Sequence, residues 1–326
     1  MERNLNGKYC IGVDLGGTTI SCAVVDKEGN MICKDEVPSY AEKGLEVTTD
    51  QIALCVKNVI EKANLTKDDI IACGMGAPGL HKAEEGVVLW SPNFNGWDGV
   101  NVYEPLNKKT GLKFYMGNDA NVATYGEYYF GMGKGSKVMV MFTLGTGIGS
   151  GVIVNGKPLS GATGAHPELG HTIIDPNGPT CGCGQKGCVE ALCSRDAICN
   201  RCASKILSGR KSLVYELCEG NTQKITPKMI SIAAENNDIV AIETLKEIGD
   251  FLGIAASNAI IAFNPDLIVY GGGVSRSDIL FEAIKKSTDK YAHKILKNYV
   301  EIKRSELGND VAILGGAALA WNEMYA

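Results

Sequence analysis

The sequence lacks the long apolar run that a membrane-spanning helix needs. Its most apolar stretch, residues 252–263, is about a dozen residues long and contains Asn258, whereas a bilayer requires about 20 predominantly apolar residues. The first ten residues, MERNLNGKYC, contain no apolar segment of the kind that directs secretion. We therefore expect a cytoplasmic protein with no membrane partner and with reduced cysteines.

Basic patches, flexible linkers, low-complexity tracts and long charge runs are also missing. A net charge of −5 without a basic arm argues against a nucleic-acid partner. The composition, 45% hydrophobic and 21% charged, is ordinary for a folded protein. A chain of 326 residues is long enough for two domains of roughly 150 residues each.

Two nucleotide-binding signatures are absent. The sequence contains no G-x-x-x-x-G-K-[ST] motif, which excludes a P-loop kinase. Residues 74–79, GMGAPG, match the dinucleotide fingerprint, but such a site needs a helix that begins there. The residues that follow, LHKAEEGVVLWSPN, have no helical period, so we reject a Rossmann site.

The chain alternates strands and helices, and one arrangement occurs twice. A strand at 8–14, a glycine turn and a returning antiparallel strand at 20–25 resemble the strand, glycine turn and strand at 138–144 and 152–154. This repeat predicts two related α/β domains packed across a cleft. Periodicity predicts further strands and helices: strands at 70–75, 112–116 and 267–270, and helices at 47–63, 120–130, 238–263, 279–293 and 311–323.

The two glycine turns, DLGGTT at 14–19 and LGTGIGSG at 144–151, are candidate phosphate sites. Turns rich in backbone N–H groups bind anions, and threonine hydroxyls add donors. Either turn could instead be a tight hairpin turn without a ligand. The occurrence of two such turns, each after a strand, favours phosphate binding.

The sequence GNDAN at 117–121 places Asp119 where a strand gives way to a helix. Asp119 could be a helix N-cap or a carboxylate general base. The two roles are compatible, because a helix N-terminus favours the ionised carboxylate. A strongly basic group is not needed in phosphoryl transfer, where orientation and charge neutralisation carry most of the chemistry.

Residues 161–190 contain four potential metal ligands: His171, Cys181, Cys183 and Cys188. Their spacing, H-x9-C-x-C-x4-C, suits a closed tetrahedral zinc site. The loop is rich in turn formers and poor in apolar residues, so a metal would supply the order that packing cannot. The alternatives are adventitious cysteines or a redox pair, because the chain has twelve cysteines in all.

Together these motifs resemble the ROK family of sugar kinases and related regulators, which has the actin-like ATPase fold. The resemblance covers nearly the whole chain and rests on eight motifs: DLGGTT at 14–19, GAPG at 76–79, SPNFNGW at 91–97, GNDAN at 117–121, LGTGIGSG at 144–151, ELGH at 168–171, CGCGQKGCVE at 181–190 and GGG at 271–273. It implies two actin-like (ribonuclease-H-like) α/β domains around a cleft. These would be a smaller domain, 1–118, and a larger one, 119–310, with a zinc-binding loop at 171–190 and a final helix, 311–326, that packs back onto the smaller domain.

The resemblance also implies ATP-dependent phosphorylation of a hexose hydroxyl, with glucose to glucose 6-phosphate as the leading expectation. Asp119 would be the general base. The implied sugar ligands are Gly79, Asn93, Asn118, Asp119, Glu168, His171 and Glu190. The implied ATP contacts are Asp14, Gly16, Gly17, Thr18, Thr19, Gly145, Thr146, Gly147, Gly149, Gly272 and Gly273. Mg2+ would accompany ATP near Asp14, structural Zn2+ would bind His171 and the three cysteines, and a homodimer is the family expectation.

Two alternatives stay open on the sequence. His166 and Pro167 precede Glu168 where many relatives have small residues, and proline restricts φ there. The sugar could therefore be N-acetylmannosamine, N-acetylglucosamine, allose or fructose. A sugar-sensing regulator would need an added DNA-binding segment, and only residues 1–7 precede the first expected strand. We expect His81 and His293, which lie in no motif, to face solvent.

Overall fold

The structure is a computed structural model that describes residues 7–91, 94–162 and 165–325. The chain forms two compact units. The first unit comprises Met1–Gly135, Val152–Pro167 and Asn309–Ala326, and the second comprises Ser136–Gly151 and Glu168–Gly308. No helix among the described residues is both long enough and apolar enough to cross a bilayer.

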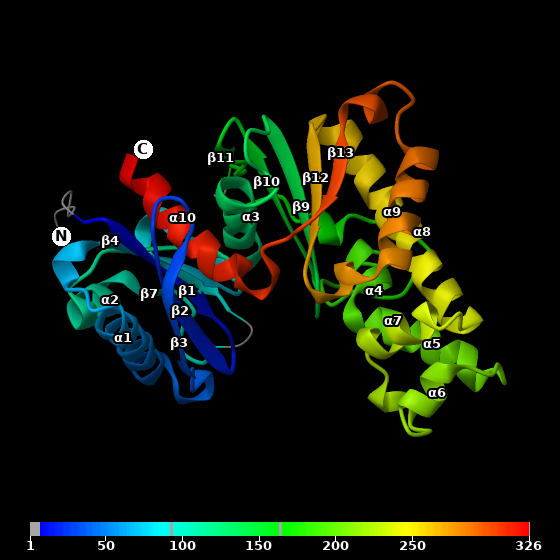
Figure 1. Ribbon diagram of the computed structural model, residues 1–326, viewed down its shortest axis with the longest axis horizontal. Coiled ribbons are helices and arrows are strands. Elements are labelled where there is room, and N and C mark those ends of the chain that lie inside the picture. Colours follow the sequence, from blue (N-terminus) through cyan, green and yellow to red (C-terminus); the bar gives the residue numbers. More distant parts are fainter. Residues whose placement is uncertain (1–6, 92–93, 163–164, 326) are drawn as a thin grey trace. The chain divides into compact units, whose positions relative to one another are not determined.

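The first unit is built on a five-stranded sheet with the order β3-β2-β1-β4-β8 (Figure 1). Its strands are β1 (Tyr9–Leu15), β2 (Thr19–Val25), β3 (Met31–Pro38), β4 (Ile70–Ala77) and β8 (Phe114–Asn118). β1, β2 and β3 are antiparallel, whereas β1, β4 and β8 are parallel. Every residue of β4 is buried, as expected of a central strand covered on both faces.

Alternate residues of β1 face two different layers of helices. Ile11 and Val13 join the apolar core that includes Ile52 of α1 (Leu45–Lys62). Gly12 lies against α10 (Val311–Tyr325), which also packs on β4 and on α3 (Asp119–Phe130). The sheet therefore separates α1 from α10 and α3.

Contacts between α10 and its neighbours are made by glycine backbones. A Cβ on Gly12 would lie 1.8 Å from the carbonyl oxygen of Ile313, and a Cβ on Gly74 would lie 1.9 Å from that of Gly316. On the helix itself, a Cβ on Gly315 would lie 1.8 Å from the carbonyl oxygen of Val122 in α3. These positions accept no side chain without movement of the backbone, because a real Cβ does not approach an atom below 3.0 Å.

A second five-stranded sheet has the order β11-β10-β9-β12-β13. Its strands are β9 (Val138–Leu144), β10 (Ile148–Val154), β11 (Lys157–Pro158), β12 (Leu267–Gly271) and β13 (Glu301–Arg304). β12 is parallel to both β9 and β13. Strand β10 runs across the division between the two units at residues 151 and 152.

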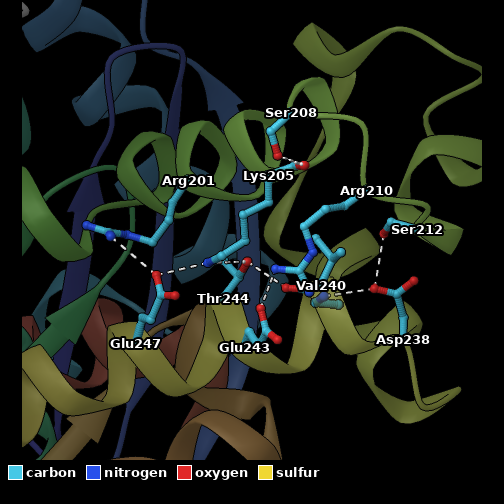
Figure 2. Close-up of polar contacts among 11 residues, drawn as sticks. Arg201, Lys205, Ser208, Arg210, Ser212, Asp238, Val240, Glu243, Thr244 and Glu247 are labelled. Atoms are coloured by element: carbon cyan, nitrogen blue, oxygen red, sulfur yellow. Dashed lines mark hydrogen bonds and ion pairs between the residues drawn. The ribbon is translucent and has the colours of Figure 1, made fainter.

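The second unit also contains six α-helices among its described residues: α4 (Val189–Cys193), α5 (Arg195–Leu207), α6 (Leu213–Leu217), α7 (Pro227–Glu235), α8 (Ile239–Phe263) and α9 (Asp278–Tyr291). α8 and α9 lie side by side (Figure 1). Gly253 permits this approach, since a Cβ there would lie 2.3 Å from Cβ of Ser287. On another side of α8, charged side chains contact α5, and Figure 2 shows Arg201 and Lys205 next to Glu247.

The sequence predicted most of these elements. The helix predicted at 238–263 is α8, and the strand predicted at 138–144 is β9. The rejection of a Rossmann site is confirmed, because β4 is followed by β5 (Leu80–Lys82) and not by a helix. The sequence did not predict β3, the small sheet of β5, β6 (Val87–Trp90) and β7 (Val100–Asn101), β11, β13, α2 (Tyr103–Thr110), or α4 to α7.

Candidate functional site

The end of β8 and the beginning of α3 are tied to the turn that follows β4. Asn118 is the N-cap of α3: its Oδ1 accepts a hydrogen bond from the Ala120 amide at 3.0 Å. Its Nδ2 donates to the carbonyl oxygen of Gly79 at 3.2 Å. Gly79 has φ +111, and a Cβ there would lie 2.2 Å from the carbonyl oxygen of Trp90, so this turn requires glycine. The first unit thus brings together Gly79, Asn118 and Asp119.

Asp119 is the first residue of α3 and follows the capping residue. Its side chain is accessible to solvent, but the surrounding protein partly desolvates the carboxylate and raises its pKa above the usual value. The backbone amides of Ala120 and of Asp119 itself oppose that rise, and Oδ1 accepts from the Ala120 amide at 2.8 Å. Because Asn118 caps the helix, Asp119 remains available for chemistry.

Asp14, near the end of β1, is a second carboxylate of this region. Burial, followed by the negative charge of Asp119, raises the pKa of Asp14 to about 6. The charge of Lys34 acts in the opposite direction. The carboxylate is therefore mostly ionised at pH 7 and mostly protonated below pH 6. Two carboxylates whose charges interact in this way attract a cation or a shared proton.

The first glycine turn, between β1 and β2, is fixed through its carbonyl groups. The Gly16 amide donates to the Thr19 carbonyl at 3.0 Å. Ser39 donates its amide to the Thr18 carbonyl at 3.0 Å and its hydroxyl to the Gly17 carbonyl at 2.8 Å. Three backbone acceptors are thus engaged by the protein, while the residues at 17–19 are exposed. This arrangement suits an anion, because the carbonyl oxygens, which would repel it, are hydrogen-bonded within the protein.

The second glycine turn, between β9 and β10, is held by Glu190 and Arg195. The amide of Gly145 donates to the carbonyl of Gly147 at 3.0 Å, and the amide of Arg195 donates to the carbonyl of Gly145 at 2.9 Å. Oε2 of Glu190 accepts from the Ile148 amide at 3.0 Å. A Cβ on Gly147 would lie 2.4 Å from the same oxygen. Glu190, expected from the resemblance to contact sugar, therefore also supports this turn.

A third turn, after β12, lies against the end of β9. Gly272 has φ +88, and a Cβ there would lie 2.3 Å from the carbonyl oxygen of Leu144. Only glycine fits this position without strain. A Cβ on Gly273 would meet no atom of the described residues within 4 Å. The second unit thus places the turns at 144–151 and 271–273 next to one another.

The four predicted zinc ligands form one cluster in the second unit. Their ligand atoms all lie within 4.8 Å of one another. Sγ of Cys181 lies 3.5 Å from Nδ1 of His171, and Sγ of Cys183 lies 3.7 Å from Sγ of Cys188. Tetrahedral zinc with Zn–S bonds of about 2.3 Å and Zn–N bonds of about 2.0 Å separates sulfur from nitrogen by about 3.6 Å and sulfur from sulfur by about 3.8 Å. The donor set and its spacing therefore fit zinc.

The zinc loop, residues 171–190, continues from a short 3-10 helix, η4 (Leu169–His171), that Glu168 precedes. The His171 amide donates to the Glu168 carbonyl at 3.0 Å, which keeps the two side chains within one turn. The Leu169 amide donates to Oγ of Ser150 on β10 at 2.9 Å. Oε1 of Glu190 lies 3.7 Å from Sγ of Cys181. Glu168, His171 and Glu190 are thus all connected to the zinc loop.

Several sequence-based expectations differ from the structure. The expectation that His81 faces solvent is wrong, because both of its ring nitrogens are buried. Asn93 lies outside the described residues. Ser39 and Ser150 hold the site's loops and were not predicted. Ser39 lies outside every motif, so no local signal identified it, whereas Ser150 lies within LGTGIGSG at 144–151 and could have been singled out as a polar side chain of that turn.

Residues 10–323 match the ROK family. The chain belongs to the ROK family. Among its relatives, the glucokinase of Thermotoga maritima is 37% identical over 310 residues, which cover 95% of this chain and 96% of the glucokinase. The solved structure of a ROK family glucokinase from Streptomyces griseus in complex with glucose and AMPPNP is 30% identical, with a TM-score of 0.83, and the match covers 96% of this chain and 99% of that one. The xylose repressor of Bacillus subtilis is 27% identical, and the match covers 97% of this ROK chain and 78% of the repressor.

Proposed function

We propose that this ROK protein transfers the γ-phosphoryl group of ATP to a hexose hydroxyl, converting glucose to glucose 6-phosphate. The observation that carries the proposal is the position of Asp119: a carboxylate with a raised pKa at the first residue of α3, beside the cap Asn118 and electrostatically coupled to Asp14. The similarity to glucokinases over nearly the whole chain supports the same reaction.

Asp119 acts as the general base. It accepts the proton of the sugar 6-hydroxyl while that oxygen attacks the γ-phosphorus, and the bond to the β,γ-bridging oxygen breaks so that ADP leaves. A raised pKa makes Asp119 a better proton acceptor than a solvated aspartate. Positioning and charge neutralisation carry the larger share of the acceleration, so the hydrogen bonds that fix Asn118 and Gly79 matter as much as basicity.

Three side chains of the second unit, Glu168, His171 and Glu190, bind sugar hydroxyls. Asn118 and the backbone of Gly79 bind others. The family resemblance implies that Asn93 is a further sugar ligand. His171 would hold zinc through Nδ1, the nitrogen that faces Cys181, and its ring would then be fixed in orientation. Nε2 of the same ring is then the nitrogen that meets a sugar hydroxyl.

The glycine turns at 14–19 and 144–151 hold the phosphates of ATP, and Gly272 and Gly273 lie at the adenosine. Mg2+ bound with ATP would neutralise charge on the phosphates, and Asp14 is the carboxylate that would hold it. The raised pKa of Asp14 fits this role, because it shows that the protein does not fully balance the negative charge of this carboxylate, which a bound cation would do. The resemblance further supports a homodimer.

A second candidate function is sugar-responsive regulation, favoured by the similarity to a xylose repressor. Other hexoses or N-acetylhexosamines are alternative substrates of the kinase, because His166 and Pro167 precede Glu168. A regulator would bind sugar without releasing ADP, whereas a kinase for another sugar would release ADP with that sugar.

The test is ADP release over a panel of glucose, fructose, allose, N-acetylglucosamine and N-acetylmannosamine. We expect glucose to give the highest kcat/KM, and Asp119→Asn to lower kcat by about 100-fold or more while glucose still binds. The matched control is Asp196→Asn, an exposed acid in the first turn of α5, which should leave turnover unchanged. Sugar binding without turnover on any sugar would instead support regulation.

A further inference from the structure

The turn between β9 and β10 is built against segments on both sides of the zinc loop. All of these segments belong to the second unit. Before the loop, the Leu169 amide donates to Oγ of Ser150 at 2.9 Å, and that serine is buried. A Cβ on the next residue, Gly170, would lie 1.9 Å from the carbonyl oxygen of Ile148. The backbone of η4 therefore packs directly on β10, just after the turn.

At the end of the loop, Glu190 makes a second connection with its side chain. Its Oε2 accepts from the Ile148 amide at 3.0 Å, and a Cβ on Gly147 would lie 2.4 Å from the same oxygen. Its Oε1 lies 3.7 Å from Sγ of Cys181, one of the four candidate zinc ligands. One carboxylate thus contacts the turn with one oxygen and the metal cluster with the other.

The backbone that carries Glu190 is itself tied to the metal cluster. Glu190 is the second residue of α4, and the N-cap of that helix is Cys188, another candidate zinc ligand. The Val189 amide donates at 3.1 Å to the carbonyl of Thr172, which follows His171. A metal held by Cys188 and His171 would therefore fix the start of α4, and with it the carboxylate of Glu190.

The first phosphate turn, at 14–19, is held by other means. The amide and the hydroxyl of Ser39 donate to carbonyls of this turn, and both segments belong to the first unit. The two turns therefore offer an internal comparison. A change in the zinc loop should reach the turn at 144–151 and leave the turn at 14–19 as it is.

We propose that Glu190 is a positioning residue, through which the order of the phosphate turn at 144–151 depends on the zinc loop. Backbone amides bind phosphate best when they are held in place beforehand. A loss of order in the loop should therefore weaken nucleotide binding, although residues 171–188 include none of the proposed ATP contacts. This consequence rests on the proposed binding of ATP, whereas the order of the turn does not.

Hydrogen exchange tests the link without sugar or nucleotide. Mass spectrometry follows the peptides that cover 144–151 and 14–19. Cys183→Ser removes the exposed ligand of the cluster, and the matched control Cys199→Ser removes a cysteine of α5 outside the cluster. In Cys183→Ser we expect exchange at 144–151 to become about 10-fold faster, with no change at 14–19. Cys199→Ser should change neither turn.

Substitutions of Glu190 separate positioning from sugar binding. Glu190→Gln keeps an oxygen that accepts from the Ile148 amide, whereas Glu190→Ala keeps none. We expect Glu190→Ala to exchange faster at 144–151 and to bind ADP about 10-fold more weakly, measured by calorimetry without sugar. Glu190→Gln should match the wild type in both measurements. Its glucose affinity should fall as in Glu190→Ala, because both variants lose the carboxylate proposed to bind sugar.

Three results would overturn the inference. Exchange at 144–151 could be unchanged in Cys183→Ser protein without zinc, which means that the loop does not order the turn. Exchange could rise equally at 14–19, which means that the chain loosens as a whole. Glu190→Gln could exchange as fast as Glu190→Ala, which means that the hydrogen bond to Ile148 is not the link. A wild-type protein that binds no ADP would contradict the proposed kinase, and the exchange measurements would still decide whether Glu190 positions the turn.

Discussion

The packing of α10 in the first unit differs from the packing of α5 on α8 in the second. α10 meets β1, β4 and α3 through buried glycine backbones. α5 and the turn after it meet α8 through long, half-exposed charged side chains, and Figure 2 shows Arg210 beside Glu243. Backbone atoms in contact cannot yield to an added group, because interiors are close-packed. Charged side chains that reach solvent can rearrange, and each pair contributes little. The first interface is therefore sensitive to added volume, whereas the charged pairs of the second tolerate change.

The largest expected effect is a methyl group added to the α10 interface. In an isolated helix Gly315→Ala would be stabilising by about 1 kcal/mol. Here its Cβ would lie 1.8 Å from the carbonyl oxygen of Val122, so we expect a loss of more than about 3 kcal/mol in the free energy of unfolding, measured by urea denaturation. Gly161→Ala is the control, because a Cβ there would come no closer than 3.4 Å to any described atom. Equal stability of the two variants would refute the volume argument.

A partly buried carboxylate of the first unit, Asp14, gives a prediction about charge instead of volume. The pKa of Asp14 is raised from 3.8 to about 6, so the folded state holds its proton more tightly than the unfolded state. The resulting destabilisation is absent below pH 4, grows between pH 4 and 6, and is complete above pH 6. Asp14→Asn should therefore stabilise the nucleotide-free protein by about 2 kcal/mol at pH 7.5 and by nearly nothing at pH 3.5. Thermal unfolding at both pH values measures this, and a gain that does not depend on pH would contradict it.

The zinc loop contains a cluster of four side chains of the kind that binds zinc, so we expect its order to depend on metal binding and not on volume. We expect Cys181→Ser to lose zinc and to lower the affinity for glucose by about 10-fold, because His171 is no longer fixed. Metal analysis and calorimetric glucose titration measure the two effects. Cys199→Ser is the control, because Cys199 lies on α5 outside the cluster. A Cys181→Ser protein without zinc but with wild-type glucose affinity would disprove the link.

The smallest effect is expected at the α5–α8 contact. Arg210 and Glu243 are 37% and 43% exposed. A double-mutant cycle with Arg210→Met and Glu243→Gln should give a coupling of about 0.5 kcal/mol, which decreases in 1 M salt. Urea denaturation of the four proteins at both ionic strengths provides the measurement. A coupling as large as the loss at Gly315 would remove the distinction between the two interfaces.

Much of the candidate site could be predicted from the sequence, because its signals are local. The spacing of His171 and the three cysteines identified a cluster that the structure assembles. Asp119 lies at the beginning of a helix, as the sequence indicated. The burial of His81 could not be predicted, because β5 has only three residues, too few to show an alternation of apolar and polar side chains. Helices α5 to α7 were missed because no sustained apolar period marks residues 195–235.

The sequence by itself indicated the long strands and helices, the glycine turns and the candidate zinc ligands, because periodicity, turn residues and ligand spacing act over a few neighbouring residues. Tertiary structure decided which glycines must remain glycine and which histidines are buried. Gly315 meets Val122, and His81 shares a cavity with His166. Such pairs are far apart in the chain, so their contacts depend on how the sheet and helices pack, a property that no short stretch of sequence contains.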